Sequence, residues 1–566
     1  MITVGFVLVM PGCGIPQLRQ AQPGPALPET FGAQTMAQPV YNTTGQHGFG
    51  EPTQFVSYVQ AARPIIPDAP NAMYDPATSS DMPAGSAGAG AVGPNIEPID
   101  PGMVSSDNSS QVGFLDFFND PALSGLIEQA LVGNQELNIL AEEIAIACNE
   151  VQARRGEYLP FATLGAGAGL EKSGQFTHWG AVEDQLEVLP GKPFPDPLPD
   201  FLVATNISWE IDIWRKLRNA KDAAALRFLA TQEGRNYVIT RLVAEVADEY
   251  YELLSLDNQM ETLDRTIAIQ QRSLEVAKAK KAAGRGTELA VQRFLAEVHK
   301  NQSEKLIIHQ EIVEVENRIN FLVGRYPQRV ERMPMAYLDM YLPALGSGLP
   351  SQLLSNRADI REAERAVAAA GLDVQVARAR FYPSLSLNAG VGYNAFNPKY
   401  LFTTPESLIY NAVGELVAPL INKNAIRADY LTANAKQLQA IYNYQRTVLN
   451  AYTEVVNHMA KVDNYGRSIE IKKQQLAALE ASVDAANRLF QNAQAEYVEV
   501  LLAQREMMET RMVLIETKRQ QLGAVVYAYQ ALGGGSVLQD FPCNLPFGHS
   551  ATCGLDYSYP EVLVTE

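Results

Sequence analysis

Two segments of this chain share one pattern, in which helix-like spacing of apolar residues changes to strict alternation at a proline. The change occurs at Pro160 in the first segment and at Pro383 in the second. The two segments align at a constant offset of 223 positions, without a gap from Leu131 to Leu170. A change of period from 3.6 to 2 indicates an alanine-rich helix that leads into a β-strand. The chain therefore contains one structural unit built twice.

Four segments show the alternation expected of β-strands, at about 159–171 and 202–213 in the first repeat and about 383–394 and 408–420 in the second. Apolar residues of these segments fall on one face and polar residues on the other. Alternation over about ten residues is typical of a transmembrane β-barrel, with apolar residues outward and polar residues inward. A half-buried strand in a soluble sheet would give the same pattern. The very long helical segments beside these strands favour the barrel.

The other regular segments are predicted to be helices of unusual length. No proline interrupts 216–281, and a helix of that span is on the order of 100 Å long. A turn at 284–286 then reverses the chain into a second helix over about 288–323. The second repeat has a matching pair, over about 424–490 and 497–532, whose first member carries heptad spacing. Such pairs predict antiparallel coiled coils or the wall of an assembly.

These patterns divide the chain into six parts. In order they are a signal-like segment at 1–13, a Pro/Gly-rich insertion at 14–112, the first repeat at 113–325, a connector at 326–348, the second repeat at 349–535, and a tail at 536–566. The insertion lacks the apolar periodicity needed to form a packed core, so we interpret it as a flexible linker.

The first 13 residues, MITVGFVLVMPGC, resemble the end of a bacterial lipoprotein signal. In such signals the cysteine, here Cys13, becomes the lipid-bearing first residue of the mature protein. No Lys or Arg precedes the apolar run, and Pro11 departs from the usual small residue. A start codon assigned too late would explain both departures. An ordinary apolar N-terminus with a chance cysteine is the alternative.

Composition excludes several classes of function. The formal net charge of -18 argues against nucleic acid as a partner, because phosphate binding requires clustered Lys and Arg. Neither the cysteines nor the histidines have the spacing of a metal site, and no catalytic constellation is present, so we expect no enzyme, metal or cofactor. Cys543 and Cys553 close a short loop in the tail and are a possible disulfide pair in an oxidising compartment.

Two longer motifs point to a family. LPSQLLSNRADIREAERAVAAA followed by FYPSLSL, and DPALSGLIEQALVGNQELNILAEEI followed by YLP, resemble the second-repeat and first-repeat signatures of the TolC/OprM-like outer membrane factors. The NodT-type outer membrane efflux lipoproteins belong to this group. The resemblance covers roughly residues 114–535, and the duplication and the element order agree with it.

The resemblance implies a mainly α fold with a transmembrane β-barrel. Each chain of a homotrimer would supply four strands to a shared 12-stranded barrel in the outer membrane, and long coiled-coil helices would form an α-barrel tunnel in the periplasm. The implied partners are outer-membrane lipid, a periplasmic adaptor (membrane fusion) protein and an inner-membrane RND-type transporter. The implied location is the bacterial outer membrane, with a lipid anchor and an extension into the periplasm.

The resemblance also suggests sites. The family has acidic residues just after the helix reversals at the inner end of the tunnel, and the matching positions here are Glu288 and Glu499. The second acidic position of the family pattern is Leu502 here, and Glu496 is a substitute for it. Rings of such carboxylates would attract cations at the gate, whereas solvated helix-turn residues are the plainer alternative. The carboxylates expected to line the barrel lumen are Glu210, Asp212 and Glu415.

The leading hypothesis is therefore a passive, gated outer-membrane exit duct of a tripartite efflux pump for small molecules. Two alternatives remain open at this point. One is the exit duct of a type I secretion system, and the other is a soluble coiled-coil scaffold with small β-tips.

Overall fold

The computed structural model describes residues 15–28, 112–193, 195–332, 337–343, 345–346, 348, 350–421, 423–492 and 494–534. Its elements, in chain order, are α1 (Phe114–Phe118), α2 (Pro121–Gly133), α3 (Gln135–Tyr158), β1 (Phe161–Glu171), α4 (His178–Glu183), β2 (Glu187–Leu189), β3 (Lys192–Pro193), β4 (Leu198–Ile211), α5 (Lys216–Ala282), α6 (Glu288–Val323), the 3₁₀ turn Tyr337–Asp339, α7 (Gln352–Asn356), α8 (Ala358–Ala379), β5 (Ser384–Ala395), β6 (Leu408–Val417), α9 (Asn424–Gln491) and α10 (Tyr497–Ala531).

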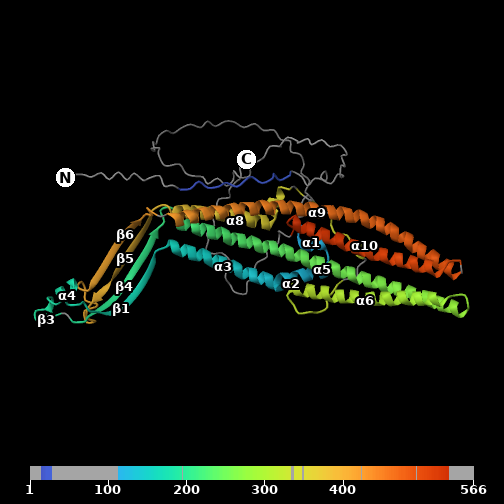
Figure 1. The fold of residues 1–566 in the computed structure, drawn as a ribbon, viewed down its shortest axis with the longest axis horizontal. Helices are drawn as coiled ribbons and strands as arrows, with labels where there is room; N and C mark the ends of the chain where they lie inside the picture. The colour runs from blue at the N-terminus through green and yellow to red at the C-terminus, as the bar shows by residue number, and fades with distance from the viewer. Residues whose placement is uncertain are drawn as a thin grey trace, which may run out of the picture.

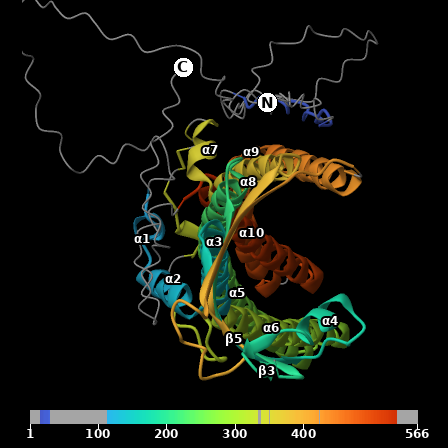
Figure 2. The same ribbon diagram turned by 90° about the vertical axis from the view of Figure 1, so that its left-hand side faces the viewer.

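The molecule is strongly elongated (Figure 1). The four-stranded sheet lies at one end, and the hairpins α5–α6 and α9–α10 extend to the other end. Seen along its length, the helical part forms an arc (Figure 2). Next to the sheet, the order of neighbouring helices is α3, α5, α8, α9, and in the far half it is α6, α5, α10, α9. The arc therefore has one edge formed by α3 and α6 and another formed by α9.

The sheet has the strand order β1-β4-β5-β6, and every pair in it is antiparallel. The strand register places polar and apolar side chains in separate transverse rows. One transverse row joins Ile211, Leu385 and Leu416, and the next row joins Glu210, Ser386 and Glu415. Successive residues of a strand point to opposite faces, so one face of the sheet is mainly apolar, while the other carries most of the polar residues and glycines together with Ile409, Val413 and Val417 of β6. β1 and β6 are the two edges of this sheet.

Glycines on the polar face allow close strand contact only in the second repeat. A Cβ added at Gly392 would lie 2.4 Å from the carbonyl oxygen of Val203, and one at Gly390 would lie 2.6 Å from Oδ1 of Asn411. Added Cβ atoms at Gly165, Gly167 and Gly169 of the edge strand β1 would meet nothing within 4 Å. Tight packing therefore accounts for the second set of glycines but not for the first.

The strands differ from the prediction mainly at their ends. β4 begins at Leu198, about four residues earlier than expected, and β6 ends at Val417, three residues earlier. The proline-rich segment between β1 and β4 contains α4 and the small β2–β3 hairpin. Thr177 explains the short helix, because its side chain caps α4 by accepting a hydrogen bond from the Gly180 amide at 3.1 Å.

The long helices run as the sequence predicts, and their ends have local causes. α5 extends over 67 residues and ends before Gly284, which has φ +72°. Thr287 caps the start of α6 through a 3.3 Å hydrogen bond from the Ala290 amide, and Gly324, with φ +80°, follows its end. The heptad residues of α9 that are buried against neighbouring helices are Leu438, Val455, Ile469, Leu476 and Val483.

The largest hydrophobic core lies midway along the molecule, where α1 and α2 pack on α5, α6 and α10. The rings of Phe117 and Tyr529 stack with centroids 4.1 Å apart. Tyr250 of α5 donates at 3.0 Å to Asp120, which also caps α2. This core fixes the first repeat to the return helix of the second repeat. In the part of the chain that the structure describes, no helix is both long and apolar enough to cross a membrane.

Candidate functional site: the helix reversals, the sheet and the repeat junction

The acidic residue of the first helix reversal is Glu288, which opens α6. Its carboxylate forms an ion pair with Lys281 and accepts a 2.7 Å hydrogen bond from Gln292. The Gln292 hydrogen bond, followed by the Lys281 ammonium, lowers the pKa of Glu288, so this exposed side chain is ionised at neutral pH. A carboxylate in the first turn also stabilises the helix by interacting with its dipole.

The second reversal carries two exposed carboxylates. Glu499 lies in the first turn of α10, and Glu496 is the residue before the helix, where its side chain makes no capping hydrogen bond. Both reversals thus present acidic side chains to solvent at the end of the molecule farthest from the sheet (Figure 1). The positions suit a ring of charge in an assembly, and they also suit ordinary solvated helix starts.

A contact between the two reversals was not anticipated from the sequence. The Lys280 ammonium donates to the carbonyl oxygen of Phe490 and lies 3.6 Å from the centroid of the Phe490 ring. Phe490 packs with Phe294 and Val500 in a small apolar cluster that joins both hairpins. The sequence signal is only that Lys280 and Phe490 each lie in the last turn before a reversal.

The structure separates the three carboxylates proposed for the lumen. Glu210 and Glu415 flank Ser386 in one row on the polar face, and Glu210 forms an ion pair with Lys216. Asp212 lies beyond the end of β4, where its buried carboxylate accepts a 2.9 Å hydrogen bond from the Arg218 amide. Asp212 therefore holds the turn between β4 and α5, and this geometry does not support a lumen-lining role.

A cavity of about 300 Å³ lies where the sheet meets the helices, next to Glu210 and Lys216. Aromatic side chains form part of this junction. The ring of Trp214 stacks on Tyr382 with centroids 4.8 Å apart, and its indole nitrogen donates at 2.8 Å to the carbonyl oxygen of Pro383. Tryptophan and tyrosine are the side chains that favour the boundary between membrane and water, so this ring pair suits that boundary.

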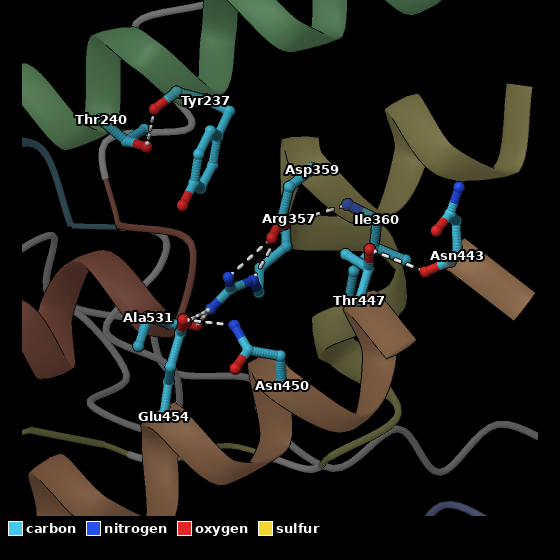
Figure 3. A network of polar contacts seen from close by, with 10 residues as sticks. All are labelled: Tyr237, Thr240, Arg357, Asp359, Ile360, Asn443, Thr447, Asn450, Glu454 and Ala531. Carbon is cyan, nitrogen blue, oxygen red and sulfur yellow. Dashed lines mark hydrogen bonds and ion pairs between the residues drawn. The ribbon is translucent and has the colours of Figure 1, made fainter. Parts of the chain in front are cut away.

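The structure reveals a polar junction in the second repeat, centred on Arg357 (Figure 3). Arg357 is 4% exposed, and its guanidinium forms ion pairs with Asp359 at 2.7 Å and Glu454 at 2.9 Å. It also donates at 3.0 Å to the carbonyl oxygen of Ala531, the last residue of α10. One side chain thus ties the start of α8 to α9 and α10. The SNRADIREAE stretch contains Arg357, but its role was not legible from the sequence.

Residues 15–28 lie against the second repeat. Ile15 and Leu18 pack near Phe381, and the side chain of Asn434 exchanges two 3.1 Å hydrogen bonds with the backbone of Arg19. This contact brings the N-terminal segment to the sheet end of α8 and α9. The proposed lipidation site Cys13 and the proposed Cys543–Cys553 disulfide lie outside the described residues.

Cys148 on α3 is disulfide-bonded, so the proposed Cys13 anchor and the proposed Cys543–Cys553 pair cannot both form among the four cysteines of this chain. Among the described residues, no group of three or more His, Cys, Asp or Glu side chains could hold a metal ion.

The pattern of two repeats, four strands and two long hairpins has a clear match among known families. The family model for outer membrane efflux proteins matches residues 126–325 and 349–534. This chain belongs to that family. Its match excludes the signal-like segment, the insertion and the tail.

Individual relatives agree with the family model. The chain is 27% identical over 435 residues to the cation efflux system protein CusC of Escherichia coli O6:H1, covering 77% of this chain and 91% of the relative. It is 26% identical to the pyoverdine export outer membrane protein OpmQ of Pseudomonas aeruginosa, covering 79% and 94%. It is 25% identical to the probable outer membrane lipoprotein SilC of Salmonella typhimurium, covering 76% and 90%.

Solved structures show the same fold. A CusC crystal structure matches with a TM-score of 0.67 and 25% identity, covering 77% of this chain and 98% of that chain. The outer-membrane channel OprN matches with a TM-score of 0.68 and 23% identity, covering 76% and 95%. The protein is therefore an outer membrane efflux channel that serves as the exit duct of an efflux pump, and it is not an enzyme. This assignment favours efflux over the secretion duct and the soluble scaffold.

Proposed function

We propose that three copies of this chain form a passive, gated duct that carries small molecules across the periplasm and the outer membrane. The sheets of the three copies form one 12-stranded barrel, and their long helices form a continuous tunnel. A periplasmic adaptor protein and an inner-membrane RND-type transporter engage the far end and supply the energy. The carboxylates at the helix reversals act at the gate.

The open edges of the protomer are the observation that carries this proposal. The sheet ends at β1 on one side and β6 on the other, and four strands are too few to close a barrel alone. The helical arc likewise ends at α3 and α6 on one side and at α9 on the other. Two different edges on one protomer favour a head-to-tail interface, which forms a ring when the rotation closes.

Both edges of the arc carry exposed apolar side chains that a single chain leaves in water. On the first edge these are Ile139 and Ile146 of α3 and Leu306, Ile307 and Phe321 of α6. On the second edge they are Leu431, Tyr442, Leu449, Ile471 and Leu489 of α9. Burial of such side chains against a neighbouring copy supplies the main driving force for ring assembly.

The two faces of the sheet indicate which side of the proposed barrel contacts lipid and which side faces the lumen. The apolar face suits contact with lipid, and Leu164 and Tyr410 on it are 77% and 82% exposed in the single chain. The opposite face carries the row of Glu210, Ser386 and Glu415 and so suits a water-filled lumen. Three copies would place six carboxylates around this level of the lumen and favour cations.

A lipid anchor at Cys13 fits the path of the N-terminal segment. Ile15 packs near Phe381, just before β5, so the chain approaches the sheet end of the molecule two residues after Cys13. A lipid-bearing cysteine at this level would place its acyl chains in the same membrane that holds the barrel. The name of the relative SilC, a probable outer membrane lipoprotein, agrees with such an anchor.

The names of the relatives refer to different cargoes, which include cations, pyoverdine and solvent. A shared duct fold with such varied cargoes suits a passive path whose specificity comes from the pump. We therefore assign this chain the export of small molecules without a cargo-specific site of its own.

Single-channel conductance in planar bilayers tests the proposal. The detergent-purified wild type is compared with the Glu288→Gln/Glu499→Gln variant, and with Glu304→Gln as a control for an exposed α6 carboxylate away from the reversal. We expect a small, cation-preferring conductance that changes in the double variant only. An unchanged conductance would retain the duct and remove the gate role of these residues. Failure of correctly folded protein to insert would overturn the barrel.

A further inference from the structure

The two repeats have different side chains at the corresponding position before the alanine-rich helix. At the repeat offset of 223, Arg357 corresponds to Asn134, and at the offset of 205 that holds for the long helices, Glu454 corresponds to Glu249. Arg357 and Asn134 each precede an alanine-rich helix, α8 and α3. Glu454 and Glu249 lie within the long helices α9 and α5. The duplication therefore supplies an internal control for each of these side chains.

One contact is the same in both repeats. The Asn134 amide donates at 2.8 Å to the carbonyl oxygen of Leu322, in the last turn of α6, while Arg357 donates at 3.0 Å to that of Ala531 at the end of α10. In each repeat the residue before the alanine-rich helix thus holds the end of the return helix. The neutral amide of Asn134 satisfies this carbonyl as well as the guanidinium does.

The charge pairing is not the same. In the second repeat, Glu454 has the buried guanidinium of Arg357 at 2.9 Å (Figure 3). In the first repeat, Asn134 brings no charge to Glu249. The ion pair of Glu249 is a longer one, 3.7 Å to the exposed guanidinium of Arg318 on α6. Glu249 is half-buried, so this weak pairing leaves its charge poorly compensated.

The neighbouring carboxylates further disfavour the ionised form of Glu249. On α5 itself, Glu245, Asp248 and Glu252 lie within one turn of Glu249. On other elements, Arg318 of α6 and Tyr527 of α10 interact with Glu249, and Glu311 of α6 and Glu516 and Arg519 of α10 interact with its neighbour Glu252. Arg519 pairs with Glu252 at 3.3 Å and with Glu516 at 3.2 Å, and the Tyr527 hydroxyl donates to Asp248 at 3.1 Å. The Arg519 guanidinium and the Tyr527 hydroxyl of α10 therefore pair with carboxylates other than Glu249.

We propose that Glu249 is a protonation switch at the middle of the duct, at which α5 packs more tightly against α6 when Glu249 is protonated than when it is ionised. Burial, followed by the Glu252 charge, raises the pKa of Glu249 to about 7, so the change falls near neutral pH. The periplasmic side of the duct would thus respond to pH through its first repeat.

Hydrogen exchange of the full-length purified protein tests the switch, with rates corrected for the intrinsic effect of pH. We compare pH 6 and pH 8 for the wild type, for Glu249→Gln, which mimics the protonated form, and for Glu304→Gln as a matched control on α6. Peptides around 242–256 and 311–323 should lose protection at pH 8 in the wild type and in the control. The opening equilibrium changes at most about tenfold per pH unit, which is the limit for one proton. Glu249→Gln should show no such loss.

A second variant, Asn134→Arg, installs the charge that the second repeat has. It should pair with Glu249 and reduce the pH response of the same peptides while keeping the response of the rest of the chain. A wild-type protein whose α5–α6 protection is equal at pH 6 and pH 8 would overturn the switch. So would a full pH response in Glu249→Gln. Both readouts concern packing within one chain, so they are independent of the gate carboxylates.

Discussion

Lys280 of α5 and Phe490 of α9 connect the two hairpins where they reverse. The ammonium donates to the Phe490 carbonyl oxygen and lies 3.6 Å from the ring centroid, so one cation satisfies a helix end and an aromatic face together. Gln504 adds a second link between the hairpins by donating at 3.1 Å to Ser273. The far ends of the two repeats are thus held together within one chain.

Replacing Lys280 with Met should loosen the reversals. The variant keeps the apolar stem and removes the charge, and cation–π contacts contribute about 0.5–2 kcal/mol. We expect faster hydrogen exchange at both reversals and a larger single-channel conductance. Lys278→Met is the control, because Lys278 pairs with Glu275 on its own helix at an exposed position. Equal effects of the two substitutions would show that the Phe490 contact has no special role.

Replacing Arg357 with Met should strongly destabilise the protein. The substitution leaves the Glu454 and Asp359 carboxylates without their shared partner and the Ala531 carbonyl without its donor, and loss of one buried partner costs about 3–5 kcal/mol. Thermal unfolding in detergent should show a much lower midpoint. Adding Glu454→Gln should restore part of the loss, because the unpaired charge is then removed. A double variant as unstable as the sum of two independent losses would contradict the pairing.

A charge on either edge of the arc should block assembly. Ile146→Glu on α3 and Leu449→Glu on α9 each place a carboxylate where the proposed ring buries apolar surface, at a cost of several kcal/mol per interface. Native mass spectrometry should show monomers in place of trimers. Val513→Glu is the control, since Val513 is exposed on α10, which lies between α5 and α9 and forms neither edge. Trimers that persist in both edge variants would argue against this interface.

The contribution of Glu249 to stability should depend on pH with a defined sign. Its folded-state pKa of about 7 lies above its ordinary value of 4.5, so the folded protein binds more protons than the unfolded chain between these limits. The stability contribution is therefore greatest below about pH 4.5 and is lost as pH rises towards 7. The unfolding temperature of the wild type relative to Glu249→Gln should fall between pH 5 and pH 8. A constant difference across that range would show that Glu249 does not titrate there.

Local patterns predicted the repeated architecture because the determining residues act locally. Pro160 and Pro383 terminate helices through their own backbone chemistry, and alternation after them marks strands irrespective of what the strands pair with. The long proline-free stretch after Lys216 predicted α5 almost to its end for the same reason. Element type and order therefore followed from the sequence.

Contacts between distant segments did not follow in the same way. Lys280 and Phe490 are 210 residues apart, and only the side-by-side packing of the two hairpins brings them together. Asp212 continued the polar alternation of its strand, yet the strand ends before it and Arg218 takes its carboxylate. In the proline-rich segment after β1, the Thr177 cap formed a short helix that overall composition concealed.

The unequal edges of the protomer have a consequence for cells that carry two versions of the gene. A chain damaged only on its α9 edge still offers an intact α3 edge, so it can join a growing ring but cannot complete one. Each defective chain would then trap normal chains in unfinished assemblies. In the proposed ring of three chains, equal production of both versions would leave only about one complete duct in eight, and the defect would be dominant.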